Sequence, residues 1–102
     1  MTLLYVTTKD KKEAQFVSKE LLEAKLIACA NIIDGMQSMY WWEGKIQSEE
    51  ECILMLKTKK ELVEKITDKV KALHSYDCPC VLELKVEGGN ADYISWLNDA
   101  LI

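Results

Sequence analysis

Residues 28–58 constrain this chain more than any other stretch, because they gather apolar and aromatic side chains into two strands folded back on each other. They hold two of the three Trp, two of the four Cys and three of the four Met residues. Glu43 and Gly44 mark the turn, since a tight hairpin needs a residue that accepts positive φ. Asp34 and Gly35 predict a bulge that bends the first strand without ending it. A chain of 102 residues must bury this surface in its own core or present it to a partner.

The residues around the start of the hairpin predict a strand, a helix and a second strand. Residues 3–7 are a short run of β-forming side chains. Asp10 with Glu13 three residues later is typical of a helix start, and apolar residues then recur at helical spacing. Residues 26–33 form an apolar run rich in Ile and Ala, which indicates a buried strand.

The residues that complete the hairpin and follow it predict a second helix, a strand and a final helix. Residues 48–51 interrupt the second hairpin strand with charge and are interpreted as a solvated loop, with hard-cation binding by Glu49, Glu50 and Glu51 as the alternative. Thr58 with Glu61 predicts a capping box that opens an amphipathic helix. Alternating side chains over 80–86 predict a half-buried strand, and Asn90 is placed to cap the last helix.

The resulting β-α-β-β-α-β order, followed by a terminal helix, defines the expected fold class. Two β-α-β halves with right-handed crossovers give an α+β, ferredoxin-like domain, in which two helices cover one face of a four-stranded antiparallel sheet. We expect residues 1–102 to form this one domain. The two hairpin strands are longer than the other two, and their overhanging edges favour pairing with another chain.

Composition and charge exclude several function classes. The formal net charge of −4 argues against nucleic-acid binding, which selects a basic surface. No apolar run is long enough to span a membrane, and the first residues lack the pattern of a signal peptide. We therefore predict a cytoplasmic protein that binds neither nucleic acid nor membrane. In that compartment the four cysteines are expected as thiols or metal ligands.

Five segments, spread in order over nearly the whole chain, resemble the CutA divalent-cation tolerance family. The segments are ACANI at 28–32, YWWEGK at 40–45, LKT at 56–58, LHSY at 73–76 and NADYISWL at 90–97. The resemblance implies a ferredoxin-like protomer in a tight homotrimer, with an architecture similar to the PII signalling trimers. It also implies a role in tolerance to copper and other divalent metals. The resemblance does not imply any enzymatic activity.

The chain departs from the family pattern where two cysteines follow its only histidine. The family has an acidic residue after the proline, and this position is Cys80 here. His74, Cys78 and Cys80 follow an H-x3-C-x-C spacing, which suits Cu(I) better than zinc because zinc sites use wider cysteine spacing. Cys29, in the ACANI segment, is the fourth candidate metal ligand. The alternative is structural, with His74 ending a helix and Cys29 serving as a small buried hydrophobe.

The aromatic residues and lysines leave further alternatives open. Tyr40, Trp41 and Trp42 are expected at an interface with another protomer, or along a small-molecule pocket. The lysines at the start of the second helix could bind an anion, but no glycine-rich phosphate loop accompanies them. A Cys29–His74 nucleophile pair lacks an orienting third group, so an enzyme is rejected.

We therefore predict a trimeric divalent-cation tolerance protein that binds copper or another divalent or soft metal ion. Two alternatives remain. One is a PII-like trimer that senses a small anionic ligand, and the other is a non-catalytic assembly scaffold.

Overall fold

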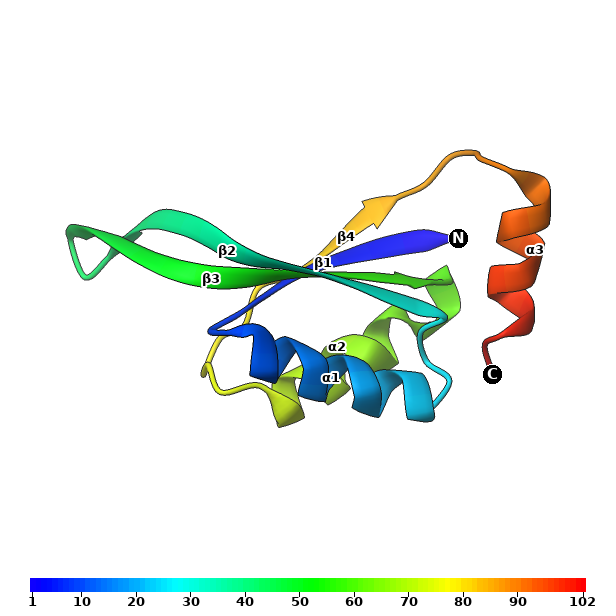
Figure 1. Ribbon diagram of the computed structural model, residues 1–102, viewed down its shortest axis with the longest axis horizontal. Coiled ribbons are helices and arrows are strands. Elements are labelled where there is room, and N and C mark those ends of the chain that lie inside the picture. The colour runs from blue at the N-terminus through cyan, green and yellow to red at the C-terminus, as the bar shows by residue number, and fades with distance from the viewer.

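Four antiparallel strands form one sheet in the order β2-β3-β1-β4, and the helices pack around it (Figure 1). The computed structural model describes all residues 1–102. The elements are β1 (Thr2–Thr8), α1 (Lys11–Glu23), β2 (Cys29–Trp42), β3 (Lys45–Thr58), the 3-10 turn η1 (Lys60–Leu62), α2 (Val63–Leu73), β4 (Val81–Lys85) and α3 (Ala91–Asp99). This is the predicted ferredoxin-like arrangement. No helix is both long and apolar enough to cross a membrane.

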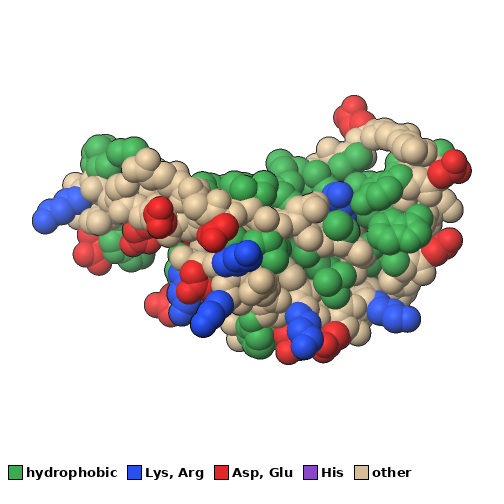
Figure 2. All heavy atoms as spheres, in the orientation of Figure 1, with side chains coloured by type: hydrophobic (Ala, Val, Ile, Leu, Met, Phe, Trp, Pro, Cys, Tyr) green, Lys and Arg blue, Asp and Glu red, His purple; other side chains and the backbone are tan.

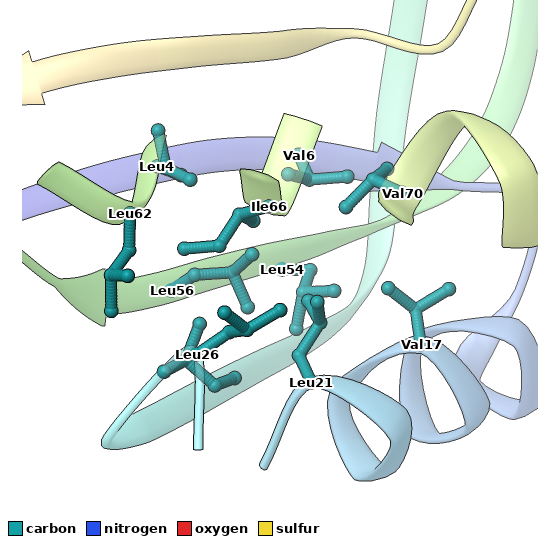
Figure 3. Packing of buried hydrophobic residues seen from close by; sticks show 11 residues of the cluster. Leu4, Val6, Val17, Leu21, Leu26, Leu54, Leu56, Leu62, Ile66 and Val70 are labelled. Atoms are coloured by element: carbon teal, nitrogen blue, oxygen red, sulfur yellow. The ribbon is translucent and has the colours of Figure 1, made fainter. Parts of the chain in front are cut away.

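The hydrophobic core lies between the sheet and helices α1 and α2, which cover the same face (Figures 1 and 3). Leu4 and Val6 of β1 and Leu54 and Leu56 of β3 supply the sheet side of this core. The residues that close the core from the helices and their connections are Val17, Leu21, Leu26, Ile27, Leu62, Ile66 and Val70. All of these side chains are at most 7% exposed, so the expected apolar stripes of both helices are confirmed.

The hairpin of β2 and β3 extends well beyond the rest of the sheet and forms an arm (Figure 1). Each of its strands has 14 residues, whereas β1 pairs with β3 only as far as Cys52. The register shifts between Ile33 and Met36, at the bulge expected from Gly35. Glu43 and Gly44 both have positive φ, as a two-residue turn of this kind requires. Turn and bulge together fix the register of the arm.

The sequence prediction for residues 48–51 was wrong, because they continue β3 and do not form a loop. Each of these residues pairs with a residue of β2, from Met39 opposite Ser48 to Met36 opposite Glu51. Partners along a long strand therefore override the low strand preference of three consecutive glutamates. The strand also places Glu49 and Glu51 on one face and Glu50 on the other.

The predicted Thr58–Glu61 capping box does not form. The Thr58 hydroxyl is fully buried and donates a hydrogen bond to the Leu26 carbonyl oxygen at 2.7 Å. The chain then passes through η1, whose N-cap residue Lys59 makes no side-chain capping hydrogen bond. By contrast, the Asp10 carboxylate accepts from the Glu13 backbone N–H at 2.8 Å, so the capping prediction for the first helix is confirmed. Thr58 has a long-range partner that local sequence spacing does not reveal.

We expect Thr58→Val to lower the free energy of unfolding by about 1–3 kcal/mol, because the buried Leu26 carbonyl would lose its donor. Urea titration at a fixed protomer concentration measures this change. Glu61→Ala is the matched control and should change the free energy by about 0.5 kcal/mol or less, since this exposed residue makes no cap. A larger loss for Glu61→Ala than for Thr58→Val would restore the capping-box interpretation, because alanine cannot close the box.

Candidate functional site

A cavity of about 700 Å³ lies where the hairpin arm leaves the sheet. The arm contributes one wall, and the segment between α2 and β4 contributes the other. The lining residues are Thr7, Tyr40, Trp42, Gln47, Glu49, Glu51, Ser75, Tyr76, Asp77, Cys78 and Cys80. This set contains three carboxylates, two thiols and three aromatic rings, and it contains no lysine or arginine. The cavity is the candidate functional site.

Strand alternation explains which residues of the arm reach the cavity. Tyr40 and Trp42 lie on the same face of β2, and Trp41 between them points to the opposite face. Glu49 and Glu51 reach the cavity from the adjacent strand by the same rule. Figure 2 shows acidic side chains along the arm and hydrophobic side chains at its end. The sequence interpretation left open an interface or a pocket for the aromatic residues, and the geometry places two of them along the pocket.

The phenol group of Tyr76 holds one of the carboxylates of the arm. The Tyr76 hydroxyl donates to Glu51 Oε2 at 2.7 Å and thereby joins the two walls. Burial and this carboxylate raise the pKa of Tyr76 far above its ordinary value. Burial and the neighbouring Glu49 carboxylate likewise raise the pKa of Tyr40. Both phenols therefore stay protonated at neutral pH and remain donors.

His74 is buried at the end of α2 and fixes the start of the segment 74–80. Its Nε2 lies 2.7 Å from the Thr7 carbonyl oxygen, which can only accept, so Nε2 carries the proton. Its Nδ1 then accepts from the Tyr76 backbone N–H at 3.0 Å. Both ring nitrogens have backbone partners, so His74 would have to exchange these hydrogen bonds to bind a metal ion.

Glu13 ties the same segment to the beginning of α1. Its carboxylate accepts from the backbone N–H groups of Lys9 at 3.1 Å and Ser75 at 2.9 Å. Burial disfavours ionisation of this side chain, but the hydrogen bonds outweigh that effect and hold its pKa below the ordinary value. A capping box predicts a bond from this carboxylate to the backbone N–H of the N-cap residue Asp10, whereas the structure gives the bond to the preceding residue, Lys9. The sequence did not reveal the bond to Ser75, which is 62 residues away.

Cys78 and Cys80 both line the cavity, Cys78 exposed and Cys80 partly buried. Burial and the Glu51 carboxylate raise the pKa of the Cys80 thiol. The structure brings no three His, Cys, Asp or Glu side chains together in an arrangement that would hold a metal ion. A two-thiolate site for Cu(I) needs only the pair, and this soft ion favours thiolate ligands. Cys78 and Cys80 are two thiols that line the same cavity.

Cys29 lies apart from this pair. It faces Lys57 at the far end of β3, whereas Glu51 of the cavity is six residues away along that strand. Six residues of strand span about 20 Å, so Cys29 is not part of the same cluster. Its Sγ is 3.9 Å from the Asn31 Oδ1, and it is partly exposed on the sheet face that α1 and α2 leave open. Sequence spacing alone did not separate Cys29 from the other three candidates.

Glu49 and Glu51 line the cavity, whereas the sequence interpretation favoured a solvated loop for them and kept cation binding as its second choice. They were assigned to a solvated loop because three glutamates follow one another. The detectable signal was the length of the partner strand, since an unbroken partner of β2 must run through residues 48–51. Read as a strand, the sequence would have placed alternate glutamates on the face of Tyr40 and Trp42.

The strand order, the long hairpin and the two covering helices define a ferredoxin-like α+β protein with a cavity beside the hairpin. The model of the family described as CutA1 divalent ion tolerance protein matches residues 2–100. The chain belongs to this family, as its sequence resemblance indicated.

Relatives and solved structures agree with this assignment. Protein CutA 1, chloroplastic, from Oryza sativa is 41% identical over 98 residues, covering 96% of this chain and 55% of the relative. This chain thus spans about half the length of that relative. The divalent-cation tolerance protein CutA of Pyrococcus horikoshii is 41% identical over 97 residues, which cover 95% of this chain and 94% of the relative. The crystal structure of CutA1 from Oryza sativa matches with a TM-score of 0.97 and 40% identity, covering 99% of this chain and 93% of the other.

We expect acid to remove a contribution of Glu13 to stability. Because its pKa in the folded state lies below the ordinary value of 4.5, the ionised carboxylate stabilises the fold above that pH. This contribution is lost as the pH falls through the lower, folded-state pKa. The free energies of unfolding of the native protein and Glu13→Gln should therefore differ at about pH 7 and converge as the pH falls below 4.5 and through the folded-state pKa. Glu23→Gln, on the exposed side of the same helix, is the control. A difference that does not depend on pH would contradict this role for Glu13.

Proposed function

We propose that this protein is a divalent-cation tolerance protein that binds a soft or divalent metal ion and contributes to metal homeostasis without catalysing a reaction. The observation that carries the proposal is the pair of thiols, Cys78 and Cys80, in an acidic cavity of a chain that belongs to this family. An acidic wall attracts cations, and the thiols select soft ones among them. Residues 1–102 act as one domain in this function.

Copper is the metal that the donor set favours. Cu(I) accepts two thiolate ligands, and Cys78 and Cys80 are the two thiols that share a cavity. Cys29 is a separate thiol on the open face of the sheet, and His74 would bind only after leaving the carbonyl oxygen of Thr7. The proposed primary ligands are therefore Cys78 and Cys80, with Cys29 and His74 as the remaining candidates.

A homotrimer in the cytoplasm is the proposed working form. The sheet face away from α1 and α2 carries Leu82 and Leu84, which are 58% and 46% exposed in the protomer. Trp41 of the arm is 73% exposed and lies on the opposite strand face. Large exposed apolar side chains are typical of protein interfaces, and the arm gives a neighbouring chain long strands to pair with. Association with other protomers would cover this surface.

The anion-sensing alternative receives less support from the lysines near the second helix. Lys59 donates to the Ile102 carbonyl oxygen, and Lys60 forms an ion pair with Glu83 at 2.8 Å. Lys57 donates to the Tyr93 hydroxyl at 3.1 Å. All three ammonium groups have partners in the chain, and the cavity itself is acidic. Cation binding therefore remains the better proposal.

We expect the purified protein to sediment as three protomers of 11.7 kDa each at micromolar concentration. Analytical ultracentrifugation measures this mass. Leu84→Glu should shift the distribution toward the monomer, because it places a charge on the surface proposed to be covered. Glu87→Lys, at an exposed position beyond the same strand, is the control for a change of charge alone. A native protein that stays monomeric would contradict the proposed assembly.

We expect the reduced protein to compete with a chelator for Cu(I) in a stoichiometric titration, and the Cys78→Ser, Cys80→Ser double variant to lose this competition. The reason is that serine removes the soft ligands and leaves the cavity otherwise intact. Cys29→Ser, about 20 Å away along the sheet, tests the separate thiol. Unchanged copper affinity in the double variant would rule out the cavity as the metal site.

A further inference from the structure

The bulge in β2 contains the only Asp–Gly pair of the chain, Asp34 and Gly35, and no Asn–Gly pair occurs. At an Asp–Gly pair the backbone nitrogen of glycine can attack the side-chain carboxyl carbon of aspartate. Glycine allows this close approach because it has no Cβ in the way. The bulge is therefore the position in the chain where such a reaction is chemically easiest.

The reacting groups of Asp34 and Gly35 already lie in contact. The Gly35 backbone N–H donates to Asp34 Oδ1 at 2.9 Å. Since Oδ1 is bonded to the carboxyl carbon, the carbon that would be attacked lies close to the attacking nitrogen. Holding two reacting groups together in this way removes much of the entropy cost of their meeting.

The bulge also leaves room for the backbone to rearrange. Asp34 and Gly35 are exposed, and neither is paired with a residue of β3, because the pairing passes directly from Ile33 to Met36. Gly35 has a φ of +75°, and apart from its neighbours no atom lies within 4 Å of the position that a Cβ would take. The regular strand pairing that restrains a backbone nitrogen is interrupted here.

The Asp34 side chain lies on the side of the sheet that the helices cover. Burial raises the pKa of the Cys52 thiol, and the carboxylates of Asp34 and Asp10 add to this effect, so both carboxylates lie near Cys52. Cys52 is buried and shares its face of β3 with the core leucines. Leu82 and Leu84 lie on the opposite face of the sheet. The Asp34 carboxylate is thus separate from the face that the proposed trimer would cover.

We propose that Asp34 is a site of spontaneous isomerisation to isoaspartate in the folded protein. The Gly35 nitrogen forms a bond to the carbon of the protonated Asp34 carboxyl group, whose OH leaves with the amide proton as water. The product is a cyclic succinimide. Water then opens this ring at the side-chain carbonyl, which restores aspartate, or at the main-chain carbonyl, which gives isoaspartate. One water is released and one is consumed, so no oxidant or other reactant is needed.

Isoaspartate would alter the segment that sets the register of the arm. The main chain would run through the Asp34 Cβ and would gain one carbon atom at the bulge. The bulge positions residues 36–42 of β2 opposite their partners on β3. A longer main chain at this point disturbs that pairing, because strand register allows no partial shift. Residues 36–42 of the isomerised chain should therefore open more readily than in the native chain.

The test compares the full chain, in its native assembly, with a synthetic peptide of residues 31–38. Both are kept in neutral buffer at physiological temperature. Isoaspartate is measured at intervals by peptide mapping with a protease that cleaves before aspartate but not before isoaspartate, and the succinimide by the loss of the mass of one water. We expect the folded protein to isomerise at Asp34 at least as fast as the peptide, because the fold holds the reacting groups together.

Other aspartates of the chain supply matched controls. The Asp10 carboxylate accepts from the Glu13 backbone N–H at 2.8 Å, so it is directed away from the nitrogen of its own neighbour and should stay unmodified. Asp34→Glu keeps the charge and should slow the reaction by about tenfold or more, because glutamate would have to close a larger ring. Asp68→Glu makes the same change at an exposed position of α2 and should leave the rate at Asp34 unchanged.

Three results would overturn the proposal. The first is slower isomerisation in the folded protein than in the peptide, which would show that the bulge protects Asp34. The second is isoaspartate at Asp10 as fast as at Asp34, which would show a reaction that does not depend on the bulge. The third is unchanged amide hydrogen exchange over residues 36–42 in the isomerised fraction, which would separate the modification from the register of the arm. The comparison with the peptide uses no variant, so it decides even where Asp34→Glu does not fold.

Discussion

The pairing of β2 with β3 is the interaction on which the rest of the structure depends. Twelve residue pairs join these two 14-residue strands from the core out to the tip of the arm, and the bulge at Gly35 and the turn at Gly44 fix their register. Because side chains alternate along a strand, a slip of one residue would exchange the cavity face for the opposite face. The same register that buries Leu54 and Leu56 therefore also directs Glu49 and Glu51 into the cavity.

The second wall depends on a different kind of constraint. Residues 74–80 have no regular secondary structure, so their position comes from side-chain hydrogen bonds to the body of the protein. Glu13 and His74 supply these bonds, and both are largely buried, which makes the bonds stronger than they would be in water. The arm contributes carboxylates and aromatic side chains to the cavity, and residues 74–80 contribute two thiols and a phenol. The cavity forms because the long strand pair faces this irregular segment, which hydrogen bonds hold in position.

Much of the fold could be predicted because its signals are local. The Asp10 cap, the helical spacing of Val17 and Leu21, and the turn at Gly44 each follow from the preferences of neighbouring residues. Predictions failed where a distant partner decided the outcome. Thr58 looked like a helix cap but bonds to Leu26, and residues 48–51 looked like a loop but pair with β2. Tertiary partners override local preference at such positions.

The sequence by itself determined the element order, the amphipathic helices, the ferredoxin-like class and the family. The reason is that hydrophobic periodicity and matches to family segments depend only on residues that are close together in the sequence. Only the tertiary structure decided which candidate residues share a site. It places Cys29 apart from Cys78 and Cys80. Both ring nitrogens of His74 form hydrogen bonds with backbone groups. Glu49 and Glu51 of the arm line the same cavity as the two thiols. The physical reason is that strand register and long-range hydrogen bonds set distances between residues that sequence spacing does not encode.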